Sequence, residues 1–245
     1  MTDAAPDVVL AAANVCKRFG ALVVLDGVTF SMRRDEAVGI VGPNGAGKTT
    51  FLSVLVGALR PEAGSVTFSG HDVTVLSAAE RCRRGLVRTH QVPRPFGGMT
   101  VFENVFVAAA NGTHFTRDEA YDRSIEALRR SALLDIANRR GETLGLLDRK
   151  RLELARALAT GPRLLLLDEI GGGLSDAEAS ELVQIIRDLR QRGIAIIWIE
   201  HIVHLLLQVT DRLICMDAGR VIADGEPKAV LANQAVIDAY LGGGV

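Results

Sequence analysis

The stretch GPNGAGKTT, residues 42–50, constrains the fold of this chain more than any other part of it. It follows the apolar run EAVGIV at 36–41 and opens a helical pattern at 48–59, so it is expected to join a buried strand to a helix. Glycines let successive backbone N–H groups curl around an anion, and the start of a helix adds partial positive charge. The pattern therefore predicts a phosphate-binding loop within an α/β domain.

Each residue type in this loop suits a part of a bound nucleotide. Lys48 would reach the β- and γ-phosphate oxygens, and Thr49 would offer its hydroxyl to Mg²⁺. A strand-to-helix turn that binds nothing is the alternative, and the strand and helix expected on either side argue against it. The other loop residues would surround the phosphates: Gly42, Pro43, Asn44, Gly45, Ala46, Gly47 and Thr50.

Two acidic residues end the apolar run LLLLDE, residues 164–169. A buried strand would deliver Asp168 to a sheet edge, where its carboxylate could hold Mg²⁺ through water. Consecutive strand residues point to opposite faces, so Glu169 could be aimed past the metal at an attacking water, as a general base. The alternative is that both acids cap the helix that follows.

Two further polar residues are candidates on weaker grounds. His201 follows the apolar run IAIIWIE (194–200) and could hydrogen-bond a γ-phosphate, but a structural role fits a single histidine equally well. Gln91 precedes a loop broken by prolines, and by itself it could be any solvated amide. The residues alone leave both assignments open.

Hydrophobic patterns divide the chain into three parts. Up to about residue 70, short apolar runs alternate with turn signals, which predicts antiparallel strands with one embedded helix. Residues 77–160 are mostly helical in pattern, and we interpret them as a helical subdomain inserted into one domain spanning residues 1–245. Capping-box spacings predict helix starts at Ser77/Glu80, Thr116/Glu119 and Ser175/Glu178.

From residue 164 onward, continuous apolar strands alternate with a helix, which predicts a mostly parallel sheet covered on both faces. The turn DAG at 217–219 predicts an antiparallel hairpin at the end of this sheet. Two short helices, near 227–232 and 234–241, would close the chain. Another helix is expected to start at Asp148.

Composition excludes several other classes of protein. The net charge of −1 provides no field that would recruit nucleic acid or an anionic membrane. Three widely spaced cysteines, Cys16, Cys82 and Cys215, suit packing in a reducing cytosol better than a disulfide framework. We see neither an export signal nor an apolar run long enough to span a bilayer, so we expect any membrane role to come through a partner.

The motifs together resemble the ATP-binding subunits of ABC transporters, over essentially the whole chain. The resemblance implies that GPNGAGKTT is the Walker A motif and LLLLDE the Walker B motif, with ATP and Mg²⁺ bound. It implies that Gln91 is the Q-loop glutamine, which also contacts the metal, and that His201 is the switch histidine. Phe19 falls where this family places an aromatic ring that stacks on adenine.

The stretches FGGMTVFENV, RLELARAL and VIDAYLGG look like those of ATPase subunits from branched-chain amino acid importers. This resemblance implies the motor subunit of an importer for branched-chain or other hydrophobic amino acids or related small solutes. The ATPases of lipopolysaccharide extraction are a similar alternative. A soluble ABC ATPase that acts without a permease, or a regulator that binds ATP without hydrolysis, belongs to a different functional class.

The family signature LSGGQ is altered in this chain. Counting back from Asp168 places LGLLD, residues 144–148, at that position, so that Gly145 replaces the serine and Leu147 replaces the second glycine. Asp148 replaces the glutamine, and Ser175 stands where the D-loop of the family often has aspartate. The signature of this family contacts the γ-phosphate of ATP on a partner subunit, so these changes favour a heterodimer in which the partner keeps an intact signature.

The resemblance also implies partners and a location. Integral-membrane permease subunits and a second ATPase subunit would bind directly, and a periplasmic or extracellular solute-binding protein would act indirectly. No nucleic acid is expected. The chain would be a peripheral protein at the cytoplasmic face of the inner (cell) membrane, where the region between Gln91 and Asn104 would transmit motion to the permease.

Overall fold

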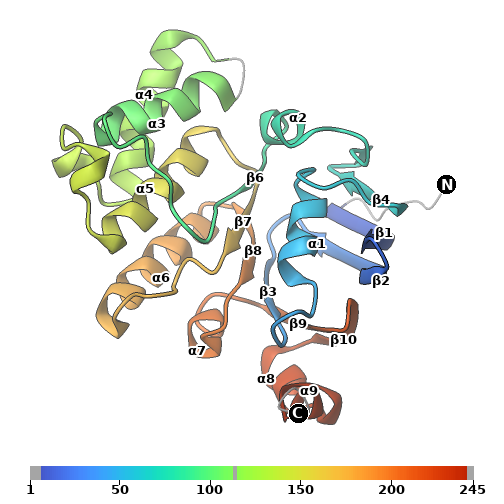
Figure 1. Cartoon of the computed structure of the whole chain (residues 1–245). Helices are drawn as coiled ribbons and strands as arrows, with labels where there is room; N and C mark the ends of the chain where they lie inside the picture. The colour runs from blue at the N-terminus through green and yellow to red at the C-terminus, as the bar shows by residue number, and fades with distance from the viewer. Residues whose placement is uncertain (1–6, 113–114, 242–245) are drawn as a thin grey trace. The chain divides into compact units, whose positions relative to one another are not determined.

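The computed structural model of the protein describes residues 7–112 and 115–241, and the chain divides into two compact units. The first unit comprises Met1–Ala78 and Ala195–Val245, and the second comprises Ala79–Ile194. Figure 1 labels the elements of both units in chain order. Among the described residues, no helix has both the length and the apolar character needed to cross a membrane.

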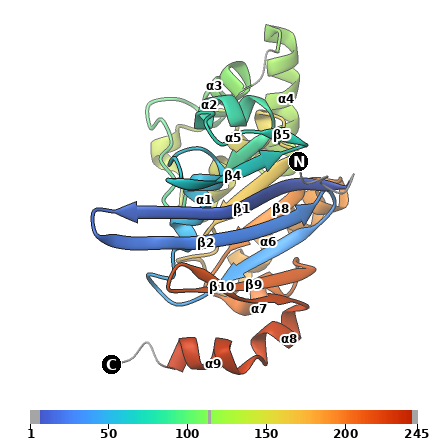
Figure 2. The same ribbon diagram turned by 90° about the vertical axis from the view of Figure 1, so that its right-hand side faces the viewer.

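An antiparallel sheet forms the N-terminal part of the first unit, as the sequence predicts. Its two longest strands, β1 and β2, run side by side in opposite directions (Figure 2). The order of strands is β2-β1-β4-β5, with the bounds β1 (Val8–Phe19), β2 (Leu22–Arg33), β4 (Ala63–Phe68) and β5 (His71–Asp72).

The first unit also contains the strands that position the candidate site. In β3 (Ala37–Val41) and β8 (Ala195–Ile199) every residue is buried, which explains their unbroken apolar sequence. Strand β3 runs parallel to β8 on one side and to β9 (Arg212–Asp217) on the other. Strand β10 (Arg220–Gly225) pairs antiparallel with β9, so the predicted hairpin at 217–219 is confirmed.

Among the helices of the first unit, α1 ends earlier than predicted. Helix α1 (Lys48–Leu55) is shorter than the predicted 48–59, because Gly57 has a left-handed φ of 78° directly after the C-cap residue Val56. The two C-terminal helices, α8 (Pro227–Leu231) and α9 (Gln234–Leu241), are confirmed. A short helix, α7 (Val203–Leu206), follows β8.

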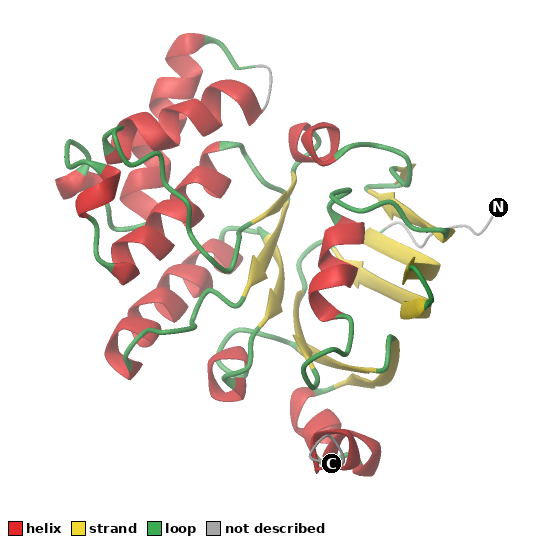
Figure 3. Ribbon diagram, in the orientation of Figure 1, coloured by secondary structure: helices red, strands yellow, loops and turns green. Residues whose placement is uncertain are grey.

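The second unit is mainly helical, and α3, α4 and α5 pack against one another (Figure 3). Strands β6 (Leu86–Arg88) and β7 (Leu164–Asp168) form a parallel pair within it. That residues 77–160 form an inserted subdomain of a single domain stays a prediction. The helices are α2 (Ala78–Arg83), α3 (Val101–Gly112), α4 (Arg117–Arg130), α5 (Leu146–Ala159) and α6 (Asp176–Gln191), with single turns at η1 (Leu134–Ile136) and η2 (Gly141–Thr143).

Side-chain caps begin two of these helices as predicted. Thr116 and Glu119 form a complete capping box at α4, and Ser175 and Glu178 form another at α6. Helix α2 begins directly after Ser77, although its capping box stays a prediction.

The expected start of α5 at Asp148 is wrong. The helix begins two residues earlier, because Gly145 is its N-cap residue, with φ −69° and ψ 175°. The backbone oxygen of Gly145 already accepts the helical hydrogen bond from Arg149 N, at 3.0 Å.

Candidate functional site

The predicted phosphate loop, residues 42–50, leads from β3 into α1 in the first unit, and its geometry requires glycine at two positions. Gly42 has φ 142°, and a Cβ there would lie 2.0 Å from the carbonyl oxygen of Met216 in β9. Gly47 is the N-cap of α1 with φ 97°, and its Cβ would lie 2.6 Å from the carbonyl oxygen of Val24 in β2. Any side chain at either position would therefore push the loop away from the strands that support it.

Lys48 is the first residue of α1, and it is only 6% exposed. Its Nζ donates hydrogen bonds to the carbonyl oxygens of Gly42, at 2.7 Å, and Pro43, at 2.9 Å. The ammonium group thus lies over the curl of backbone that its own loop forms. An ammonium group beside a curled backbone loop at the start of a helix is an arrangement that can bind a phosphate group.

His201 leaves the sheet at the same edge as the phosphate loop. Strands β3 and β8 are parallel neighbours, and the loop follows the carboxyl end of one while His201 follows the carboxyl end of the other. The His201 side chain is exposed, and its backbone N–H donates to the carboxylate of Glu200 at 3.2 Å. Crevices at this edge of parallel sheets are where ligands of α/β proteins bind.

The remaining candidates of the first unit are accessible. Thr49 is exposed and Thr50 half-buried at the start of α1. Phe19, at the end of β1, is 49% exposed, and the Nζ of Lys17 lies 5.6 Å from the centre of its ring. An exposed aromatic ring at a strand end suits stacking on a planar ligand, rather than the core role that its residue type alone would suggest.

The thiol of Cys215, in β9, is buried, and this burial is the main reason that its pKa rises to about 11. The nearby carboxylate of Asp217 raises the pKa further, while Lys48 opposes the shift. The group is therefore a neutral thiol at physiological pH and packs as a small apolar side chain, as the sequence predicts.

In the second unit, Asp168 ends β7 and is 3% exposed. One carboxylate oxygen, Oδ2, accepts a hydrogen bond from Nη2 of Arg88 in β6 at 2.5 Å, and this ion pair is largely buried. The other oxygen, Oδ1, is buried without a hydrogen-bond partner among the described residues. An orphaned carboxylate oxygen of this kind fits a role toward a metal-bound water.

Glu169 follows at once, in a left-handed backbone conformation with φ 47°. Its Oε2 accepts a short hydrogen bond from the side-chain amide of Gln91, so the structure brings these two predicted residues together. The buried ammonium of Lys150, in α5, donates to the backbone oxygens of Gln91 at 3.1 Å and Glu169 at 3.2 Å. Left-handed backbone at a non-glycine residue is strained, and such strain is concentrated at functional sites.

The residues predicted to form an altered signature lie at the start of α5. Gly145 is exposed, has no side chain with which to cap the helix, and a Cβ added to it would meet nothing within 4 Å. Leu146 is 43% exposed, and Leu147 and Asp148 are half-buried in the first turn. A serine at 145 would therefore fit without strain and would supply the missing cap.

Substitution of Arg88 tests the ion pair. We expect Arg88→Met to lower the free energy of unfolding of the nucleotide-free chain by about 3 kcal/mol, since it leaves the buried charge of Asp168 uncompensated. Urea denaturation measures this loss. The double variant with Asp168→Asn should recover most of it, because no charge is then stranded. Equal losses in the single and double variants would show that Arg88 contributes through packing alone.

Comparison with known families decides the identity of the chain. Residues 25–171, more than half of its length, match the family described as ABC transporter. The chain belongs to the ABC transporter family. It is accordingly an ATP-binding subunit and an ATPase of the kind that drives transport, as the resemblance of its motifs predicts. Residues 220–245 match a second family, described as branched-chain amino acid ATP-binding cassette transporter.

Several ATP-binding proteins of transport and export systems are similar to this chain over nearly their whole length. The branched-chain amino acid transport ATP-binding protein LivG of Salmonella typhimurium is 36% identical, covering 95% of this chain and 97% of LivG. BraF of Pseudomonas aeruginosa, of the same description, is 34% identical, covering 96% and 98%. The lipopolysaccharide export ATP-binding protein LptB of Haemophilus influenzae is 33% identical, covering 96% and 97%.

Solved structures show the same ABC cassette fold. An ATP-binding cassette of an ABC transporter in its ADP conformation superposes with a TM-score of 0.88 at 30% identity, covering 96% of this chain and 99% of that one. The predicted P-loop α/β fold with antiparallel N-terminal strands is thereby confirmed.

Three residues that contact the predicted motifs are not among the site residues predicted from the sequence: Arg88, Lys150 and Tyr240. The residues around Arg88 and Tyr240 in the sequence do not indicate these contacts, because the partners, Asp168 and Gly42, are far away in the chain. The position of Lys150 could have been recognised from the sequence. It lies four residues before the buried Leu154, so its charge falls on the apolar face of α5. A buried lysine on such a face needs acceptors, and the structure supplies backbone carbonyl oxygens.

Proposed function

We propose that this chain is the ATP-hydrolysing motor subunit of an ABC importer for branched-chain or other hydrophobic amino acids or related small solutes. The observation that supports this most is the match of residues 220–245 to the branched-chain family, because this segment lies outside the general ABC match. The similarity to LivG and BraF supports the same solute class.

We assign the nucleotide to the phosphate loop. Its backbone would enclose the phosphates while Lys48 turns from its present carbonyl acceptors to the β- and γ-phosphate oxygens. Phe19 would stack on the adenine ring. His201 would donate a hydrogen bond to the γ-phosphate, and Glu169 would accept a proton from the attacking water, with Gln91 holding its carboxylate in place.

The resemblance to ABC subunits assigns Mg²⁺ to oxygen ligands of this chain. The free oxygen Oδ1 of Asp168 and the exposed hydroxyl of Thr49 are hard oxygen ligands, with Gln91 as a third candidate. The described residues contain no group of three or more His, Cys, Asp or Glu side chains that could hold a metal by themselves. Bound with the nucleotide, Mg²⁺ would neutralise phosphate charge, and Asp168 would orient its water ligands.

The same proposal names partners and a location. Permease subunits and a second ATPase subunit would bind this chain at the cytoplasmic face of the inner (cell) membrane, as a peripheral complex. Affinity capture of the tagged full chain from detergent-solubilised membranes tests this directly. We expect a polytopic permease and a second ATPase to co-purify, and vesicles containing the captured complex to take up radiolabelled leucine when ATP is supplied.

Lipopolysaccharide extraction is the second candidate, supported by the 33% identity to LptB. Co-purification with permeases that extract lipopolysaccharide, without leucine uptake, would favour that function. A permease-free soluble complex would instead indicate an ABC ATPase that does not act in transport. The permease therefore decides among these functions, since solute choice resides there rather than in this chain.

We further propose that the partner is a different ATPase with an intact signature. At LGLLD, Gly145 removes a hydroxyl that could bond a charged phosphate, and Leu147 adds bulk where glycine allows close approach. The ATP bound by the partner would face this weakened turn. The site completed by the Lys48, Asp168 and Glu169 of this chain would then perform most of the turnover.

Restoring the signature tests this asymmetry. In a complex already carrying Glu169→Gln, the remaining turnover reports the site of the partner, and Gly145→Ser with Leu147→Gly should raise it roughly tenfold or more, the worth of a bond to a charged phosphate. Gly145→Ala with Leu147→Gly is the matched control, because it adds a Cβ without a hydroxyl. Equal steady-state rates in the two variants would show that the hydroxyl contributes nothing, and rates that both stay at the Glu169→Gln level would contradict the proposal. Equal losses from the glutamate substitutions in the two subunits would do so as well.

A further inference from the structure

The side chain of Tyr240 links the C-terminal helix α9 to the predicted phosphate loop. The tyrosine hydroxyl accepts a hydrogen bond from the backbone N–H of Gly42 at 2.8 Å, across 198 residues of sequence. Burial raises the pKa of Tyr240 and the bond from Gly42 opposes this shift, so the hydroxyl is neutral at physiological pH. The contact is a neutral hydrogen bond to the first residue of the loop.

Gly42 is the most constrained point of that loop. Its Cα packs so closely on β9 that no Cβ fits beside the carbonyl oxygen of Met216. Its own carbonyl oxygen accepts the hydrogen bond from Nζ of Lys48 at 2.7 Å. Tyr240 and Lys48 therefore hold the N–H and the C=O of the same residue, and a shift of Gly42 would also move the acceptor that positions the lysine.

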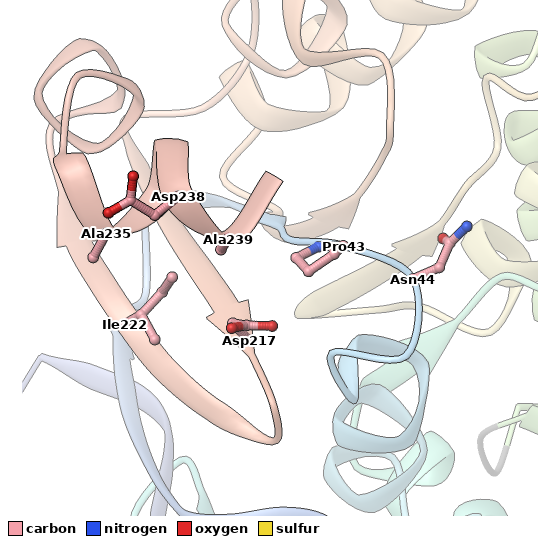
Figure 4. Close-up of a pocket in the computed structure, with 7 residues that line it drawn as sticks. All are labelled: Pro43, Asn44, Asp217, Ile222, Ala235, Asp238 and Ala239. Carbon is pink, nitrogen blue, oxygen red and sulfur yellow. The ribbon is translucent and has the colours of Figure 1, made fainter. Parts of the chain in front are cut away.

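Most side chains of α9 are exposed. Val236 is its only buried residue, while Ile237, Tyr240 and Leu241 are 37%, 47% and 76% exposed. A pocket of about 630 Å³ is lined by residues of α9, of the phosphate loop and of β9 and β10. Figure 4 shows Asp238 and Ala239 of α9 on one side of this pocket and Pro43 on the other. Where this pocket lies, α9 and the loop are not packed against each other, and the hydroxyl of Tyr240 supplies a hydrogen bond between them.

We propose that Tyr240 is a positioning residue for nucleotide binding, which holds Gly42 so that docking of α9 and the affinity of the phosphate loop are linked. A preorganised loop binds phosphate more tightly because less ordering remains to be done on binding. The linkage is reciprocal, so a bound nucleotide should in turn hold α9 in place. This inference rests on the assignment of GPNGAGKTT as the phosphate loop.

Tyr240→Phe tests the bond, since it removes the hydroxyl and keeps the ring. Loss of one neutral hydrogen bond should raise the dissociation constants for ATP and ADP about three- to tenfold. In the assembled complex, KM for ATP should rise by the same factor while kcat at saturating ATP stays within about twofold, because ground-state and transition-state binding lose equally. Tyr121→Phe is the matched control: Tyr121 is the other of the two tyrosines, 52% exposed in α4.

Amide hydrogen exchange of the full chain separates positioning from general destabilisation. In Tyr240→Phe, exchange at Gly42 should accelerate, while exchange at Phe51, whose N–H bonds to Gly47 at 2.8 Å, should not change. Added ADP should slow exchange throughout α9 in the parent chain and much less in the variant.

Three results would overturn the inference. Identical affinities in Tyr240→Phe and Tyr121→Phe would show that the hydroxyl does not position the loop. Equal acceleration at Gly42 and Phe51 would show a merely structural role. Exchange in α9 that ADP leaves unchanged in the parent chain would exclude the linkage. If Lys48→Ala also left nucleotide affinity unchanged, the phosphate-loop assignment itself would fail, which is a different outcome.

Discussion

Glu169→Gln should reduce ATP turnover by roughly 10²- to 10⁴-fold while ATP remains bound, since the amide cannot accept the proton of the attacking water. The contacts that hold residue 169 in place should be kept in this variant. The amide oxygen of the new glutamine can still accept the hydrogen bond from Gln91, and the backbone of residue 169 keeps the contact with Lys150. The defect should therefore lie in the chemical step.

Steady-state hydrolysis and retention of radiolabelled ATP by the assembled complex measure this outcome together. Glu126→Gln is a suitable control, because Glu126 is 39% exposed and pairs with Arg129 and Arg130 only along the surface of α4. It should leave turnover within about twofold. Parental hydrolysis rates in Glu169→Gln would show that another group accepts the proton.

Lys48→Ala should weaken ATP binding by roughly 100-fold and abolish transport, because it removes hydrogen bonds from a cation to phosphate oxygens, each worth about 1.5–3 kcal/mol. The buried position of Lys48, with its Nζ already directed at the loop by Gly42 and Pro43, means that little reorganisation precedes binding in the parent chain. Titration calorimetry with ATP measures the affinity directly.

A thermal scan shows whether the variant still binds. A saturating ligand stabilises the parent protein according to its affinity, so the increase in Tm on adding ATP should nearly vanish in Lys48→Ala. Lys228→Ala in α8, an exposed lysine, is the matched control and should keep the full increase. Unchanged ATP affinity and uptake in Lys48→Ala would refute the role of the phosphate loop.

Local chemistry explains why much of this fold can be predicted from sequence. The capping boxes at Thr116 and Ser175 each complete a hydrogen-bond pattern within four residues, and the hairpin at 217–219 needs only backbone freedom at the turn. The phosphate loop likewise depends on neighbouring glycines and on the helix that follows. Helix ends are less predictable, since Gly145 caps α5 through backbone alone and shifts its start by two residues.

The sequence by itself determined the family of this protein and predicted its phosphate loop and its pair of acids, because each depends on residues adjacent in the chain. Only the tertiary structure decided which side chains hold those groups in place. Arg88 meets Asp168 across 80 residues, and Tyr240 meets Gly42 across 198, because a parallel strand pair and a returning helix bring them together. Such contacts follow from chain topology, which no local spacing of residues encodes.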